Sequence, residues 1–270
     1  MPTKPYAGTQ SVRRAIALLK MFSDERHEWG LSELAREVGL NKTTAYRLLT
    51  ALQSEGMVAR NPLTEGWRLG PEAITLGALA LRSNDLVSAA RPELEALVRE
   101  TGETASIEVL VGNDVLILDG VEGPSLVGAS SEVGTRWPAH ATSTGKVLLA
   151  AERAGGGKVP GGPNGGPGRS KNRRQLRKLT PRTITDPDRL DRELERVAER
   201  GWATAVEELE TGYVAVGAPI RDHEGRAVAA ISIGGPAARL TAGRIPELAK
   251  LVFRTADRIS RRLGGRSARR

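Results

Sequence analysis

Two short amphipathic segments joined by a glycine constrain the fold of this chain more than any other feature. Apolar residues recur at helical spacing in ELAREVG (33–39), and Ser32 is the expected N-cap of this helix. The same spacing recurs over residues 41–56, where Asn41 is the expected N-cap. Gly39 ends the first segment, as glycine commonly does just past a helix. Two small helices with so short a turn are typical of a helix-turn-helix motif.

The second of these helices has a polar face without acidic residues. No Asp or Glu occurs between Asn41 and Gln53. Amide, hydroxyl and guanidinium groups near the N-terminal end of such a helix suit the base edges and phosphates of the DNA major groove. The alternative is a three-helix domain with a solvated polar face. The candidate DNA-contacting residues of this helix are Lys42, Thr43, Thr44, Tyr46 and Arg47.

A β-hairpin is expected directly after this helix. The extended segments MVAR (57–60) and WRLG (67–70) flank NPLTEG, which is rich in turn residues. A hairpin at this position would be the wing of a winged helix. It would bring Arg60 and Arg68 near the DNA backbone, so both are further candidates for DNA contact.

The rest of the chain alternates predicted helices and strands, which indicates an α+β protein of two domains. The predicted boundaries are 1–70 for a DNA-binding domain, 71–84 for a linker helix opened by Pro71, 85–263 for a second domain and 264–270 for a basic tail. The expected elements of the second domain are a helix over 85–101, strands over 104–111, 114–120 and 125–130, helices from Ser143 and over 187–200, a strand pair over 213–220 and 227–235, and a last helix over 243–263. A Gly/Pro-rich insert near 155–170 is expected to be disordered.

Composition excludes several kinds of site. The chain has no cysteine, which rules out disulfides, thiolate catalysis and cysteine-ligated zinc. Its three histidines lie far apart, so we expect no metal and no cofactor. No signal sequence and no apolar stretch of membrane-spanning length is found, and the prediction is a cytoplasmic protein without membrane contact.

The net charge of +8 is distributed unevenly. Residues 1–70 carry ten basic and seven acidic residues, and residues 151–184 carry nine basic and one acidic. The last ten residues include five arginines, and the remainder of the chain carries 16 basic against 24 acidic residues. This division favours a DNA-facing module attached to an acidic body. The basic run of the insert is either an additional phosphate contact or a solvated segment.

Several blocks of sequence together resemble the IclR-type bacterial transcriptional regulators. SVRRAIALLKMF, LSELAREVGLNKTTAYRLLTALQSEGMVAR and WRLG are similar to the family's winged DNA-binding domain, and WPAHATSTGKVLLA is similar to a signature of its effector-binding domain. LTPRTITDPDRLDRELERVAERGWA, EELETGYVAVGAPI and AVAAISIGGP follow in the family's order. The resemblance covers residues 10–152 and 176–263. It implies a winged helix, a dimerising linker helix and a GAF-like α/β domain that binds a small metabolite.

The segment HATSTGK marks the expected effector site. A phosphate-binding loop is excluded, because His140 stands where that loop needs glycine and Val147 where it needs Ser or Thr. Thr142, Ser143 and Thr144 stand at a helix start, where backbone N–H groups and the helix dipole favour an anion. The resemblance implies that this segment contacts a carboxylate effector. The alternative is that these residues only cap the helix.

The resemblance also implies that the pocket is completed by later segments. Carried over by position, it points to Ala205, Glu207, Ala215, Ser232 and Gly234. Some members place an acid at the position of Ala205 and a cysteine at that of Ala215. The alanines here favour a larger or more apolar acid over a very small hydroxy- or keto-acid.

The resulting hypothesis is a ligand-responsive regulator and not an enzyme. It would bind a pseudo-palindromic operator in double-stranded DNA as a homodimer or a dimer of dimers, with repression favoured over activation, and it would sense a small organic acid. The apolar residues Ile74, Leu79 and Leu81 of the linker helix are the expected dimer contact. An architectural DNA-binding protein without an effector and a metabolite-binding enzyme are the two alternatives.

Overall fold

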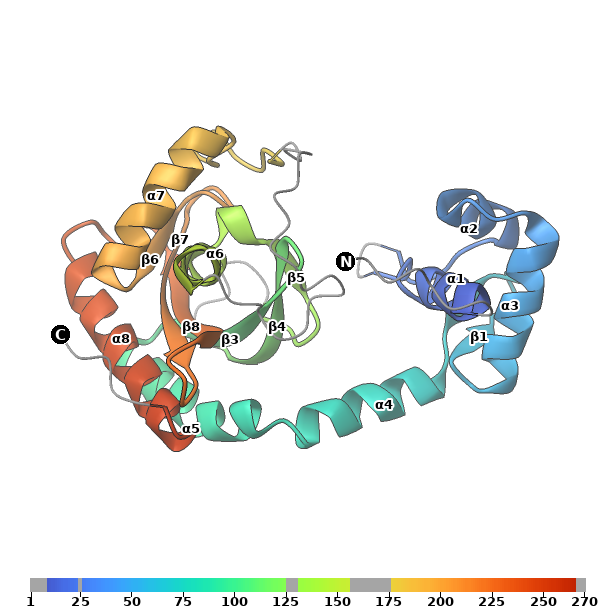
Figure 1. Ribbon diagram of the computed structural model, residues 1–270, viewed down its shortest axis with the longest axis horizontal. Helices are drawn as coiled ribbons and strands as arrows, with labels where there is room; N and C mark the ends of the chain where they lie inside the picture. Colours follow the sequence, from blue (N-terminus) through green and yellow to red (C-terminus); the bar gives the residue numbers. More distant parts are fainter. Residues whose placement is uncertain (1–8, 24–25, 125–130, 156–175, 266–270) are drawn as a thin grey trace. The chain divides into compact units, whose positions relative to one another are not determined.

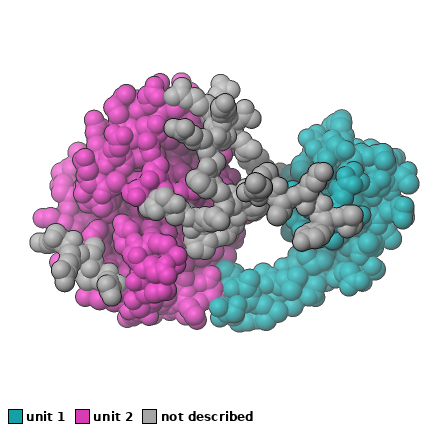
Figure 2. Space-filling model, in the orientation of Figure 1, with its two compact units in different colours: residues 1–83 teal, residues 84–270 magenta. Residues whose placement is uncertain are grey.

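The chain folds into two compact units, residues 1–83 and residues 84–270 (Figures 1 and 2). The computed structural model describes residues 9–23, 26–124, 131–155 and 176–265. The expected strand over 125–130, nearly all of the Gly/Pro-rich insert and most of the basic tail lie outside these residues. No helix in the described part of the chain is long and apolar enough to cross a membrane.

The first unit is a small helical domain with a two-stranded antiparallel sheet. Its elements are α1 (Thr9–Leu19), α2 (Leu31–Val38), α3 (Lys42–Ser54), β1 (Val58–Arg60), β2 (Trp67–Leu69) and α4 (Pro71–Arg82). The buried core consists of Leu18, Trp29, Leu34, Leu49, Val58 and Trp67. The expected helix-turn-helix and hairpin are therefore both present.

Local capping defines the turn between α2 and α3. Gly39 adopts the left-handed conformation with φ 71°, which is accessible to glycine at little cost. The side chain of Asn41 accepts a hydrogen bond of 2.8 Å from the N–H of Thr44, as expected for an N-cap.

The expectation that Ser32 caps α2 is wrong. The helix begins at Leu31, with Gly30 as its N-cap, and Ser32 lies in the first turn. The cause is a long-range pairing, because Trp29 exchanges backbone hydrogen bonds of 2.9 and 2.8 Å with Trp67 of β2. This bridge keeps the chain extended up to Trp29 and lets the helix begin directly after Gly30.

The second unit is built on one six-stranded antiparallel sheet in the order β5-β4-β3-β8-β7-β6. Its strands are β3 (Thr104–Val111), β4 (Asp114–Val121), β5 (Arg136–Pro138), β6 (Ala203–Val206), β7 (Tyr213–Arg221) and β8 (Ala227–Pro236). Its helices are α5 (Asp85–Thr101), the 3-10 turn η1 (Ala139–Ala141), α6 (Ser143–Gly155), α7 (Pro187–Arg200) and α8 (Ile245–Arg262). The expected α+β architecture is thus confirmed (Figure 1).

The two faces of this sheet are covered by different helices. Helices α5 and α8 pack with one face in a large apolar core, and α6 and α7 pack with the other. Side chains alternate between the faces along each strand. In β8, Ile231 and Ile233 are fully buried in the core with α5 and α8, whereas Ser232 between them faces the α6 side.

Candidate functional site

Helix α3 presents the predicted DNA-contacting residues on the surface of the first unit. Ala45 and Leu49 are buried, whereas Lys42, Thr43, Tyr46 and Arg47 are exposed and Thr44 is half-buried. Neither Lys42 nor Arg47 forms an ion pair with any residue that the structure describes. The helix therefore offers both cations and an aromatic hydroxyl to a partner.

The two arginines of the hairpin differ in their surroundings. Arg60 is paired with Glu65 across the turn, and its Nε also donates to the carbonyl of Glu65 at 3.3 Å. Arg68 is exposed, and its positive charge helps to lower the pKa of Glu28, whose hydrogen bonds with Thr64 and Asn61 have the larger effect. An exposed ion pair contributes about 0–1 kcal/mol, so Arg60 can exchange Glu65 for a phosphate.

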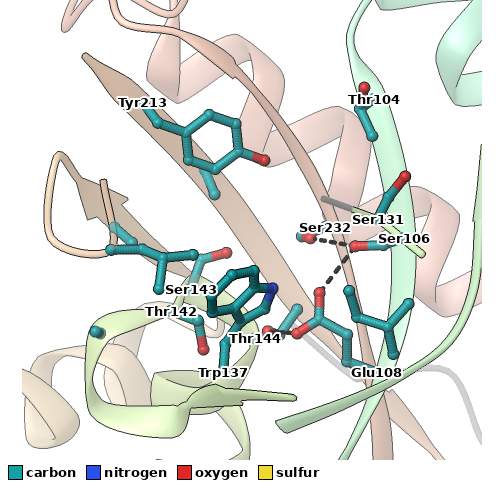
Figure 3. A pocket seen from close by; sticks show the side chains of 15 residues that line it. Thr104, Ser106, Glu108, Ser131, Trp137, Thr142, Ser143, Thr144, Tyr213 and Ser232 are labelled. Carbon is teal, nitrogen blue, oxygen red and sulfur yellow. Dashed lines mark hydrogen bonds between the residues drawn. The ribbon is translucent and has the colours of Figure 1, made fainter. Parts of the chain in front are cut away.

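The second unit contains a cavity between the sheet and the start of α6 (Figure 3). Including the solvent at its opening, it holds about 470 Å³ of space. The lining residues are Thr104, Ser106, Glu108, Ile117, Ser131, Trp137, Ala141, Thr142, Ser143, Thr144, Ala205, Leu209, Tyr213, Ala215 and Ser232. Hydroxyl groups therefore dominate its polar surface.

The first turn of α6 directs backbone donors at this cavity. The hydroxyl of Thr142 accepts from the N–H of Gly145 at 3.0 Å and so caps the helix. Among the residues that the structure describes, no acceptor is bonded to the N–H of Ser143 or Thr144. Gly217 of β7 lets the strand approach the start of α6 closely, since a Cβ there would lie 3.1 Å from the nitrogen of Thr144.

A buried carboxyl lies beside these donors. Glu108 accepts a 2.8 Å hydrogen bond from the hydroxyl of Ser106 and a second one from the hydroxyl of Thr144 (Figure 3). The hydroxyls of Ser106 and Ser232 are 3.1 Å apart, which matches their pairing across β3 and β8. Burial raises the pKa of Glu108, and the hydrogen bonds only partly oppose this.

Two of the predicted pocket residues do not line the cavity. Glu207 begins the turn after β6 with φ 53°, and its carboxylate accepts from the N–H of Gly212 at 2.8 Å and pairs with Arg182 at 3.0 Å. Gly234 lies behind Tyr213, because a Cβ at position 234 would lie 1.8 Å from the tyrosine oxygen. The other six predicted pocket residues do line the cavity, and they are Thr142, Ser143, Thr144, Ala205, Ala215 and Ser232.

A buried ion pair joins α6 to the turn that follows β6. Lys146, with a side chain only 1% exposed, contacts Glu208 at 2.6 Å between Nζ and Oε1. Burial raises the pKa of Glu208, and the charge of Lys146 opposes this. The lysine that superficially suggested a phosphate-binding loop thus stabilises the turn between β6 and β7.

The lining residues that the sequence alone did not indicate belong mainly to the sheet. Thr104, Ser106 and Glu108 occupy alternate positions of β3, whereas Ala105 and Ile107 point into the opposite core. This alternation of polar and apolar residues is visible in TASIEVLV and indicates a polar face. Trp137 and Tyr213 had no comparable local signal.

The comparisons with known proteins cover both units. The family model of the IclR helix-turn-helix domain matches residues 11–62, and that of the bacterial transcriptional regulator IclR C-terminal domain matches residues 78–158 and 168–261. The glycerol operon regulatory protein of Streptomyces griseus is 34% identical over 257 residues, with 94% of this chain and 96% of that protein covered. The transcriptional repressor IclR of Escherichia coli is 31% identical over 266 residues, covering 97% and 93%.

Solved structures agree with these matches. IclR of Thermotoga maritima has a TM-score of 0.63 at 30% identity, and an IclR homologue of Microbacterium hydrocarbonoxydans complexed with 4-hydroxybenzoate has 0.71 at 26%. Each comparison covers 94% of this chain and 98% of the other. The fold and the sites therefore define a helix-turn-helix transcriptional regulator with a separate C-terminal domain. The chain belongs to the IclR family, whose members are DNA-binding regulators and not enzymes.

Proposed function

We propose that this regulator is a cytoplasmic repressor that binds a pseudo-palindromic operator as a dimer or a dimer of dimers and responds to a small organic acid. Residues 1–70 bind DNA, residues 71–84 link and dimerise, and residues 85–263 bind the effector. One observation carries the proposal. The same chain holds an exposed cationic helix face in a helix-turn-helix and a hydroxyl-lined cavity with two N–H donors, and neither the cations nor the donors have a partner among the described residues.

Helix α3 is suited to read DNA. Its exposed residues combine a guanidinium, an ammonium and hydroxyls at the end of a recognition helix that enters the major groove. One such helix reads too few base pairs for a unique genomic site, which favours a symmetric dimer.

Helix α4 supports dimerisation. It buries no residue within the described part of the chain, and Ile74, Leu76 and Leu79 are 75%, 49% and 50% exposed. Leu81 is half-buried. An apolar face of this kind is typical of a protein interface, and we assign a second copy of the chain to it.

The cavity supports an acidic effector. Two N–H groups at a helix start, which have no acceptor among the described residues, and the helix dipole favour a carboxylate. The relative from Microbacterium hydrocarbonoxydans was crystallised with an organic acid, 4-hydroxybenzoate. Repression is favoured because several relatives, including that of Escherichia coli, are named repressors.

Fluorescence anisotropy on the full-length protein tests the proposal. The DNA upstream of its own gene and a random duplex of equal length are titrated at low and moderate salt. We expect tighter binding to the upstream DNA that persists as salt rises, because base contacts are less salt-sensitive than phosphate contacts. An organic acid that binds should then release the operator. The proposal of a sequence-reading regulator would be contradicted if binding were equally tight and salt-sensitive on both duplexes and on the genomic fragments tested by footprinting.

A further inference from the structure

We infer that Glu108 is a specificity-determining residue of the cavity and that the effector is a hydroxylated acid. The effector carboxylate lies at the N–H groups of Ser143 and Thr144, and an effector hydroxyl forms a hydrogen bond with the carboxyl of Glu108. This inference rests on the proposed function, because it specifies the ligand of the same site.

Glu108 is positioned to meet a ligand. It follows Thr104 and Ser106 on the cavity face of β3, and its residue is 6% exposed. One of its carboxyl oxygens accepts from Ser106 and the other from Thr144, and the hydroxyl of Ser232, beside Ser106, is a third donor that opposes the rise of its pKa. A carboxyl oxygen can form two such bonds. A ligand in the cavity therefore meets remaining hydrogen-bonding capacity at Glu108, directly beside the first turn of α6.

The charges around the cavity determine which chemical group of the ligand can lie beside Glu108. No Lys, Arg or His is among the described residues that line it, and the buried cation of α6, Lys146, is committed to Glu208. A second carboxylate against Glu108 would face a like charge or a single shared proton. Burial raises the pKa of Glu108, which favours its neutral form and permits an acid to bind nearby.

A hydroxyl is the group that pairs with Glu108 in either protonation state. It donates to the ionised carboxylate and accepts from the protonated one. A methyl or methylene at the same place would leave a buried carboxyl oxygen without a partner, which carries a desolvation penalty. An ammonium group would require the ligand and Glu108 to bury two full charges together, which costs more than it returns unless the geometry is excellent.

The side chains around Glu108 also offer hydroxyl groups to a ligand. Ser106, Ser232 and Thr104 follow one another on the cavity face of neighbouring strands β3 and β8. Burial raises the pKa of Tyr213 above its usual range, so its phenol stays a hydroxyl at physiological pH. Hydroxyls adapt as donors or acceptors, so they can serve a hydroxylated ligand without a fixed charge.

Matched acids on the wild-type protein test the inference by isothermal titration calorimetry. The pairs are lactate and propionate, malate and succinate, and 4-hydroxybenzoate and benzoate, with L-alanine as the amine counterpart of lactate. In the pair that binds, we expect the hydroxylated member to bind about tenfold or more tightly, because a site built for a hydroxyl rejects the analogue lacking it. Alanine should bind more weakly than lactate.

Variants then assign the preference to Glu108. Glu108→Gln keeps hydrogen-bonding capacity and should keep the hydroxyl preference, whereas Glu108→Met has a similar length and should abolish it. Glu100→Met, at an exposed site of α5, is the control for loss of a carboxylate. Calorimetric unfolding without ligand reports whether residues 84–270 of each variant are folded, because operator binding is assigned to residues 1–70.

The outcomes separate this inference from the proposed function. If acids bind but the deoxy member of each pair binds as tightly, the role of Glu108 is wrong and the organic-acid effector stands. Preference retained by a folded Glu108→Met protein, or tighter binding of alanine than of lactate, also overturns the inference. If none of the acids binds while operator binding is specific, the acidic effector of the proposed function fails as well.

Discussion

The two functional regions of this regulator use polar side chains in opposite ways. On α3, Lys42, Thr43, Tyr46 and Arg47 are exposed and their side chains have no hydrogen-bond or ion-pair partner among the described residues, and only Ala45 and Leu49 are buried. In the cavity, the polar residues are largely buried and bonded to one another, as Glu108 is to Ser106 and Thr144. A surface residue without partners contributes little to folding, whereas a buried, bonded one affects folding and ligand binding together.

This difference predicts how variants in the two regions behave. Replacing an exposed residue of α3 should change DNA affinity without changing stability. Replacing a buried polar residue around α6 should change stability first, and ligand affinity as a consequence. The following variants test that separation.

The largest effect is expected for Lys146→Met. It removes the cation from a buried ion pair and leaves the carboxyl of Glu208 without compensation, one oxygen of which already has no described hydrogen-bond partner. Breaking such a pair costs about 3–5 kcal/mol of folding free energy. Calorimetric unfolding should show the loss, and hydrogen exchange should place it in residues 84–270.

The matched control for this variant is a double replacement. Lys146→Met combined with Glu208→Leu removes both charges, and a well-packed apolar pair is often as stable as a buried ion pair. We therefore expect the double variant to recover most of the lost stability. A single variant as stable as wild type would mean that water solvates the pair, and the contrast between the two regions would fail there.

Arg47→Ala should change DNA affinity and leave stability unchanged, in contrast to Lys146→Met. Arg47 is exposed on α3 and forms no ion pair with the described residues. If it makes a bidentate base contact, its loss weakens operator binding by about 1–3 kcal/mol and leaves the unfolding temperature unchanged. Anisotropy titrations of operator and random DNA measure this.

Two comparisons sharpen the Arg47 result. Arg99→Ala, which removes an exposed arginine of α5 in the other unit, should leave operator affinity intact. An equal loss on operator and random DNA would show that Arg47 touches only phosphate. A lower unfolding temperature would show that it supports the fold, which contradicts the separation.

The exposed region was predictable because its geometry is local. Which residues of α3 face solvent follows from neighbours three and four positions apart, and the Asn41 cap depends on Thr44 alone. The start of α2 was predicted wrongly because it depends on the pairing of Trp29 with Trp67, which are 38 positions apart. Even in a small domain, long-range backbone pairing can determine where a helix begins when local propensity does not.

The residues that line the cavity could be predicted only where they follow from local sequence or from the resemblance to the family. Thr142, Ser143 and Thr144 could be placed from the helix start, whereas Glu108 was missed. Its place in the cavity depends on β3 pairing with β8, which sets Ser106 opposite Ser232 across 126 positions. Glu207 was misplaced because the chain turns immediately after β6 and its side chain leaves the sheet's alternation.

The smallest effect is expected for Asn41→Ala, which tests the boundary between the two behaviours. Asn41 is exposed like its neighbours on α3, but its side chain caps the helix by accepting from the N–H of Thr44. Loss of an N-cap costs about 1 kcal/mol. We therefore expect a small fall in the unfolding temperature of the first unit, measured by calorimetry of the full chain.

Asn41→Ser separates the cap from any DNA contact. Serine caps a helix about as well as asparagine, so this variant should keep the stability that alanine loses. If Asn41 only caps, operator affinity should follow stability in both variants. If Ser restores stability but operator affinity stays low, the asparagine amide itself contacts DNA, and a single residue then combines the structural role of the buried region with the binding role of the exposed one.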